Sequence, residues 1–176
     1  MFDPEGPILG IDPGVSRCGY GAVQGHGTRI RAVAGGVLRT PPEDPLPERL
    51  AALERDLAAL FAELRPSGLA VERVLFQVNV RTAMSTGQAS GVALLVAART
   101  GVPVAHYSPN EVKLAVTGDG RADKRQIQEM VARLLRLDAP PKPADAADAL
   151  ALAVCHAWGA PLRTAVATGN GNRVPT

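Results

Sequence analysis

The chain has 176 residues, 46% of them hydrophobic and 3% aromatic, and a formal net charge of +2. This length favours a single domain, whose core must be built from Ala, Leu and Val side chains. No apolar run is long enough to cross a bilayer and no signal-peptide pattern is recognisable, so we expect a soluble protein of the cytoplasm. Cys18 and Cys155 lack metal-type spacing, which excludes a cysteine-based zinc site and predicts free thiols in a reducing compartment.

The first part of the chain predicts three strands followed by a helix. Strand-like patterns cover residues 8–12, 18–25 and 28–40, the last two joined by a Gly-His-Gly turn. Leucines then recur at alternating steps of four and three from Leu46 to Leu64. This spacing predicts an amphipathic helix, with Pro47 near its first turn.

The second part of the chain predicts alternating strands and helices. We expect strands at 69–76 and 102–107, and helices at 80–100, 109–117, 123–137 and 143–158. Residues 159–176 lack periodicity, which predicts a disordered tail after a domain of residues 1–158. An antiparallel meander followed by βα alternation predicts an α/β fold, in which a mixed sheet has helices packed on it.

Two carboxylates stand at unusual positions in predicted strands. Asp12 ends the apolar strand "ILGID" and is followed at once by Pro and Gly. Asp-Pro-Gly is good turn chemistry, so Asp12 either opens a turn or holds a cation. Glu72 lies within a strand that is apolar on both faces, which indicates a central strand and a second interior carboxylate. The alternative is an edge strand with Glu72 in solvent.

Two further carboxylates, Asp145 and Asp148, are three residues apart on one face of an Ala-rich helix. A helix cap or the helix dipole would explain one of them, but two are harder to explain in this way. Four carboxylates from two strands and one helix would repel one another unless they bind hard divalent cations. Two Mg²⁺ ions about 4 Å apart can activate a water molecule and stabilise the leaving oxygen in phosphodiester hydrolysis.

Six motifs occur in one order between residue 8 and about residue 158: "ILGIDPG", "GYG", "VERV", "GQASGVAL", "VKLAVTGDGRADKRQIQEMV" and "ADAADALALA". As a set they resemble the RuvC-type Holliday-junction resolvases. The resemblance implies a ribonuclease-H-like fold with a five-stranded mixed sheet and helices on both faces. It also implies a homodimer that nicks four-way DNA junctions symmetrically in recombination and repair.

The same resemblance places the catalytic and metal-binding carboxylates of the family at Asp12, Glu72, Asp145 and Asp148. It implies two Mg²⁺ ions in each active site, with Mn²⁺ as a substitute, and cleavage that leaves 5′-phosphate and 3′-hydroxyl ends. It further implies a partnership with the branch-migration motor formed by RuvA and RuvB. The small-residue helix at 80–100 corresponds to the family's dimer interface.

Basic residues around a Gly-bearing loop predict a phosphate-binding surface, although a solvated charged turn would have the same composition. These residues are Lys113, Arg121, Lys124 and Arg125, and the resemblance matches the two lysines to basic positions near the active site. Asn79 and Arg81 follow the fourth strand, where the family contacts the junction centre. These resolvases often have an aromatic residue where Leu75 stands here, with Phe76 next to it, so which of the two probes the junction stays open.

Two alternative functions remain open from the carboxylates alone. One is another ribonuclease-H-like nuclease that acts on RNA or on an RNA–DNA hybrid, and the basic segment from Lys113 to Lys124 argues against it. The other is a non-catalytic junction-binding module, against which the four carboxylates argue. Actin-like kinases share a strand-Asp-Gly loop, but 176 residues leave no room for their second domain.

Overall fold

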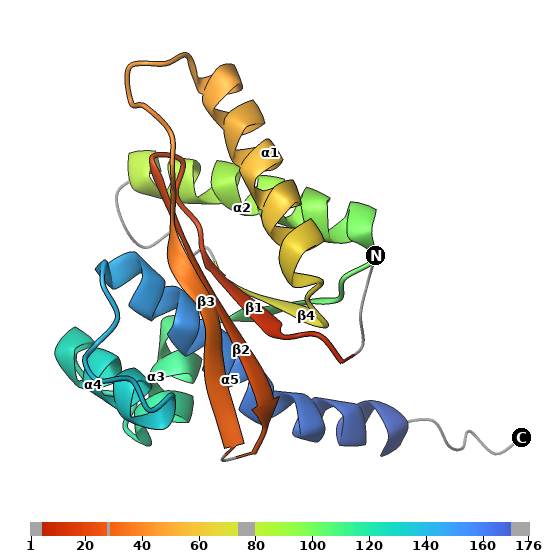
Figure 1. Cartoon of the computed structure of the whole chain (residues 1–176), viewed down its shortest axis with the longest axis vertical. Helices are drawn as coiled ribbons and strands as arrows, with labels where there is room; N and C mark the ends of the chain where they lie inside the picture. Colours follow the sequence, from red (N-terminus) through yellow and green to blue (C-terminus); the bar gives the residue numbers. More distant parts are fainter. Residues whose placement is uncertain (1–4, 28, 74–79, 170–176) are drawn as a thin grey trace, which may run out of the picture.

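The computed structural model describes residues 5–27, 29–73 and 80–169 (Figure 1). Within these ranges, none of the helices combines the length and apolar character that a membrane crossing requires. Cys18 and Cys155 are both buried, and each is a thiol rather than half of a disulfide, as the sequence predicts. Burial raises the pKa of the Cys18 thiol to about 12, which indicates an unreactive core residue.

The sheet has five strands in the order β3-β2-β1-β4-β5. The strands are β1 (Ile8–Asp12), β2 (Arg17–His26), β3 (Arg29–Arg39), β4 (Gly68–Glu72) and β5 (Val104–Tyr107). The first three pair antiparallel, whereas β4 is parallel to both β1 and β5. The mixed sheet that the sequence predicts is therefore confirmed, with β4 in an interior position.

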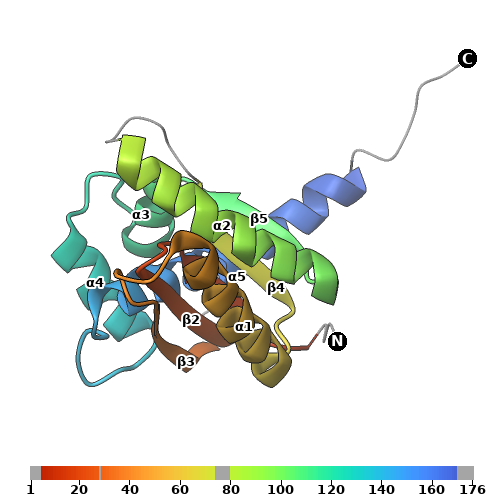
Figure 2. The same cartoon turned by 90° about the horizontal axis from the view of Figure 1, so that it is seen from above.

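Five helices cover the two faces of the sheet (Figures 1 and 2). They are α1 (Leu46–Leu64), α2 (Val80–Thr100), α3 (Pro109–Thr117), α4 (Lys124–Leu134) and α5 (Ala144–Gly169). One core cluster joins α1 and α2 to one face, and the second joins α3, α4 and α5 to the other. Strand alternation explains the division, because Leu69 and Val71 belong to the first cluster and Ala70 to the second.

The leucine periodicity of α1 gives the buried face of that helix. Leu53, Leu57 and Leu60 are buried together with Phe61, while Leu46 in the first turn is 39% exposed. The helix ends where Arg65 adopts a left-handed conformation with φ 46° and donates its N–H to the carbonyl of Phe61. Helix α1 thus has the bounds that the sequence predicts.

Four element bounds differ from the sequence prediction by two residues or more, one of them the start of β5 at Val104 rather than at residue 102. Strand β4 ends at Glu72 rather than continuing to residue 76, so Glu72 terminates its strand instead of lying within it. Helix α4 ends at Leu134, and Leu135 and Arg136 form its C-terminal turn. Helix α5 continues to Gly169, eleven residues past the predicted end, and so runs into the segment expected to be disordered. The apolar periodicity that marks α5 ends with its contact to the sheet, which explains why the sequence underestimates its length.

Candidate active site

Asp12 and Glu72 lie at the ends of two neighbouring parallel strands. The register of β1 and β4, continued by one residue, places the two residues beside each other. Gly10 and Ala70, two residues earlier in each strand, both face α5. Because side chains two residues apart share one face of a strand, both carboxylates also point toward α5. Asp12 is therefore the last residue of β1, and its side chain points from the sheet toward α5.

Helix α5 supplies Asp145 and Asp148 from its first two turns. Its backbone lies directly on the sheet, since a Cβ added to Gly19 would be 2.3 Å from the Asp145 carbonyl oxygen. A Cβ added to Gly10 would be 2.0 Å from the carbonyl oxygen of Ala149. The sequence predicts close approach from the alanines of the helix; the glycines of β1 and β2 are equally necessary for it.

Arg17 is a site residue that sequence analysis missed. Its Nε and Nη2 atoms both donate to Asp145 Oδ2, with an Nε to Oδ2 distance of 3.1 Å. Arg17 begins β2, and the antiparallel register pairs Asp12 with Gly19. Strand β2 therefore extends two residues past the end of β1. Arg17 thus lies at the same end of the sheet as the carboxylates. That register is the signal from which the sequence could have identified it.

Lys124 is the second cation at the site. It is the first residue of α4, directly after the N-cap Asp123, whose side chain accepts a hydrogen bond from the N–H of Gln126. The Lys124 Nζ atom lies 2.7 Å from Asp148 Oδ2. The basic loop that the sequence associates with the carboxylates thus reaches them through this lysine.

The carboxylates perturb one another electrostatically. Burial raises the pKa of Asp12 from 3.8 to about 7, and the negative charges of Glu72, Asp148 and Asp145 add to that rise. Burial and the nearby charge of Asp148 also raise the pKa of Glu72. Such repulsion shows that the site has more negative charge than its own residues compensate.

Two ion pairs, Arg17–Asp145 and Lys124–Asp148, lie at the more exposed side of the site. They favour the charged forms of Asp145 and Lys124. The hydrogen bond from Arg17 holds the pKa of Asp145 below its ordinary value. The hydrogen bond to Asp148 raises the pKa of Lys124. Side chains in these pairs are between 28% and 62% exposed, so solvent and a ligand can reach them.

The donor set fits hard divalent cations, which prefer carboxylate oxygen ligands. Among the described residues, Arg17 and Lys124 are the cations that pair with these carboxylates, and burial together with the neighbouring negative charges raises the pKa of Asp12. Across the part of the chain that the structure describes, no three His, Cys, Asp or Glu side chains are close enough to hold an ion as they stand. Asp145 and Asp148 are instead paired with Arg17 and Lys124, so these two side chains would have to rearrange if they held a metal ion.

The other predicted DNA-binding residues lie on several different elements. Arg121 and Arg125 are exposed on the loop before α4 and on α4, where Arg125 pairs with Glu129 at 3.0 Å. Lys113 is half-buried on α3. Arg81 lies in the first turn of α2. Leu75, Phe76 and Asn79 lie outside the described residues.

A mixed five-stranded sheet with acidic residues at the ends of β1 and β4 and on the helix across them is the ribonuclease-H-like fold. A family model described as crossover junction endodeoxyribonuclease RuvC matches residues 8–156. A relative of that name from Salinispora arenicola is 60% identical over 91% of this chain and 92% of its own length.

Solved structures agree with this match. The Thermus thermophilus RuvC in complex with a Holliday junction substrate has a TM-score of 0.85 and 36% identity, over 90% of this chain and 97% of the other. The yeast mitochondrial Holliday junction resolvase shares the fold, with a TM-score of 0.64 at 15% identity over 93% of this chain and 85% of the other. The chain belongs to the RuvC family, whose nucleases are metal-dependent.

Proposed function

We propose that this protein is a Holliday-junction resolvase that hydrolyses phosphodiester bonds with two Mg²⁺ ions, which Mn²⁺ can replace. The observation that carries the proposal is that Asp12 and Glu72 lie side by side where two interior strands end, opposite the acidic turns of α5. Burial with unbalanced negative charge is the electrostatic environment that a divalent cation stabilises. Membership of the RuvC family supports the choice of a four-way junction as substrate.

The four carboxylates would hold the ions, which when bound supply Lewis acidity and activate water for the hydrolysis. The backbones of Asp12 and Glu72 belong to paired strands, so these two carboxylates form the side of the site that the sheet provides. Asp145 and Asp148 have flexible partners, and each must release or share its cation when the ions bind. Lys124, once released from Asp148, has its ammonium group free to contact a phosphate beside the carboxylates.

Paired incision requires two active sites related by a two-fold axis, so we infer a homodimer. An exposed stripe on α2 supports this inference, because apolar or small residues recur there at steps of three and four. The stripe comprises Val80, Met84, Gly87, Gly91 and Leu95. The α2 stripe faces away from the sheet and leaves open space over both glycines. The branch-migration motor of RuvA and RuvB is the further partner that the resemblance predicts, in the cytoplasm.

Nicking assays with a mobile four-way junction, a linear duplex and an RNA–DNA hybrid, each with Mg²⁺, test the function directly. The expected result is symmetric nicking of the junction and little cleavage of the other two substrates. Preferential cleavage of the hybrid would identify the other ribonuclease-H-like activity instead. Tight junction binding without cleavage in either Mg²⁺ or Mn²⁺ would identify a non-catalytic binding module.

A further inference from the structure

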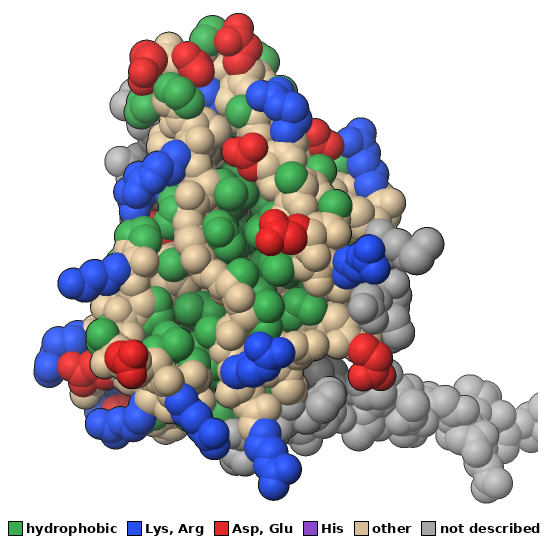
Figure 3. All heavy atoms as spheres, in the orientation of Figure 1, with side chains coloured by type: hydrophobic (Ala, Val, Ile, Leu, Met, Phe, Trp, Pro, Cys, Tyr) green, Lys and Arg blue, Asp and Glu red, His purple; other side chains and the backbone are tan. Residues whose placement is uncertain are grey.

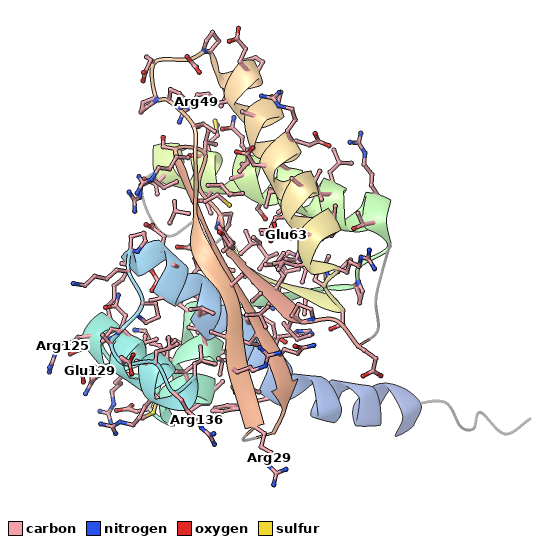
Figure 4. All side chains as sticks on the ribbon, in the orientation of Figure 1. Arg29, Arg49, Glu63, Arg125, Glu129 and Arg136 are labelled. Carbon is pink, nitrogen blue, oxygen red and sulfur yellow. The ribbon has the colours of Figure 1, made fainter. Side chains whose placement is uncertain are left out.

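A basic cavity lies at the opposite end of the sheet from the carboxylates. It has a volume of about 480 Å³ and lies between the β2–β3 hairpin and the C-terminal end of α4. Its lining consists of Gln24, Gly25, Arg29, Ile30, Arg31, Leu135 and Arg136. Figure 3 shows Lys and Arg side chains gathered along this lower edge of the molecule, and Figure 4 shows Arg29 and Arg136 at the same end.

The cavity has positive charge without compensation from its own lining. Three of its residues are arginines and none is acidic. Arg31 donates from Nη2 to Gln24 Oε1 at 2.8 Å, which leaves its charge intact. Among the ion pairs formed by described residues, none includes Arg29, Arg31 or Arg136. Guanidinium groups arranged around an open cavity bind phosphate oxygens well.

Arg136 occupies a backbone position that favours a different residue. It follows the C-cap of α4 with φ 55°, in the left-handed region where glycine or asparagine is the usual residue. An arginine there accepts backbone strain that glycine would relieve. Its side chain lines the cavity.

Two elements connect the cavity to the candidate active site. Lys124 begins α4 and Arg136 follows twelve residues later, a span of about 18 Å at the helical rise. Along β2, Arg17 lies at the acidic end and Gln24 at the cavity, about 23 Å apart at the rise of a strand. Because each base pair advances about 3.4 Å, these spans correspond to roughly five to seven base pairs of duplex.

We propose that the basic cavity is a second phosphate-binding site, which holds the backbone of a junction arm about five to seven base pairs from the cleaved phosphate. The inference rests on the proposed function and extends it from the junction centre to the arms. Duplex DNA is the favoured ligand because Lys124 and the cavity lie at the two ends of one helix, at a spacing that a short duplex spans. Two separated groups of cations match a continuous polyanion better than a small anion.

Arm length provides the test, with affinities measured in the absence of divalent metal so that no cleavage occurs. The two junctions have arms of about 4 or about 15 base pairs, closed by hairpin loops so that the short stems stay paired. The double variant Arg29→Ala/Arg136→Ala should bind the long-arm junction about tenfold more weakly, with a salt slope lower by about two. Its affinity for the short-arm junction should equal that of the parent.

Arg55→Ala is the matched control, because Arg55 is exposed on α1, on the opposite face of the sheet. Arg136→Gly removes the guanidinium while relaxing the backbone, so it should raise thermal stability and still weaken long-arm binding. Arg136→Lys should recover much of the affinity, since a lysine also contacts phosphate. A merely structural role of Arg136 would give the reverse pattern, with Arg136→Gly binding as the parent does.

The outcomes separate this inference from the proposed function. If the double variant binds long-arm junctions as Arg55→Ala does, or loses equal affinity for both arm lengths, the arm contact is wrong even though the parent still nicks junctions. If the parent neither binds nor nicks a four-way junction, the proposed function fails first. Loss confined to long arms supports the cavity as a duplex site.

Discussion

The two ends of the sheet, on the face that α5 covers, have opposite charge. Where β1 and β4 end, four carboxylates face two cationic side chains, and the pKa of Asp12 rises to about 7. At the other end, three arginines line a cavity that has no acidic residue. The first end favours divalent cations, whereas the second attracts a polyanion by itself. Binding and cleavage should therefore be separable by substitution.

The largest expected effect of that separation is on cleavage. Asp12→Asn should lower the rate of junction nicking by roughly 10³-fold, because losing a carboxylate that we propose to hold metal would cost several kcal/mol of transition-state stabilisation. Asp148→Asn should act in the same direction. Junction affinity measured without metal should stay near that of the parent, since the cations that contact phosphate are retained. Parallel loss of binding and nicking in a folded variant would break the distinction between the two ends.

The acidic end should also limit stability when no metal is bound. Burial and neighbouring charges raise the pKa of Asp12 above its unfolded value, so the folded state binds the extra proton between about pH 4 and 7. The contribution of Asp12 to the stability of the metal-free parent therefore falls as pH rises through that window. With chelator at pH 8, the free energy of unfolding of Asp12→Asn should exceed that of the parent by about 2 kcal/mol. This difference corresponds to a Tm roughly 4–8 °C higher.

Thermal unfolding of the parent and Asp12→Asn at pH 5 and pH 8 gives the comparison. The difference in Tm should narrow at pH 5, because Asp12 is then protonated in the folded parent. Added Mg²⁺ should stabilise the parent more than the variant. A constant difference at both pH values would mean that the carboxylate does not titrate as its surroundings indicate.

A third effect concerns the pairing of cuts rather than cutting or binding. Gly91 is exposed on the α2 stripe, and a Cβ added there meets nothing within 4 Å in the monomer. Gly91→Leu should therefore keep its fold but overpack a dimer interface. On a supercoiled cruciform plasmid, the ratio of linear to nicked product should fall about tenfold as sedimentation shifts toward monomer. A monomeric variant that still linearises the plasmid efficiently would exclude the interface.

The smallest expected effect is at Lys124, which lies at the acidic end beside Asp148. Lys124→Ala should weaken junction binding about three- to tenfold for all sequences alike, with a salt slope lower by about one. Arg125→Ala should have a smaller effect, because Glu129 on the same helix already pairs with that guanidinium. A changed sequence preference with an unchanged slope would indicate base contact by Lys124.

Much of the candidate site could be predicted because its residues break local patterns. A carboxylate that ends an apolar strand, and two on one face of an Ala-rich helix, are visible without a structure. Arg17 was not predicted, since its role depends on how far β2 extends past β1, which is a property of strand register. Basic residues are common on surfaces, so one more arginine at a strand start gives no local signal.

The basic cavity could not be predicted for a related reason. Its residues come from the two strands of a hairpin and from the end of a helix about a hundred residues later. Only the packing of α4 beside the hairpin brings them together. The succession of strands and helices along the chain and most helix bounds follow from periodicity. The length of α5 beyond the sheet does not, because no apolar face is required there.

The contact between α5 and the sheet gives some residues without functional groups a decisive role. Gly10 and Gly19 leave no space for a methyl group beneath the helix backbone. Gly19→Ala would displace the turn that holds Asp145, although alanine is chemically inert. A genetic screen for inactive alleles should therefore recover this substitution together with changes to the carboxylates. Interpreting such an allele as evidence for a missing reactive group would be wrong, because what it changes is the separation between two rigid elements.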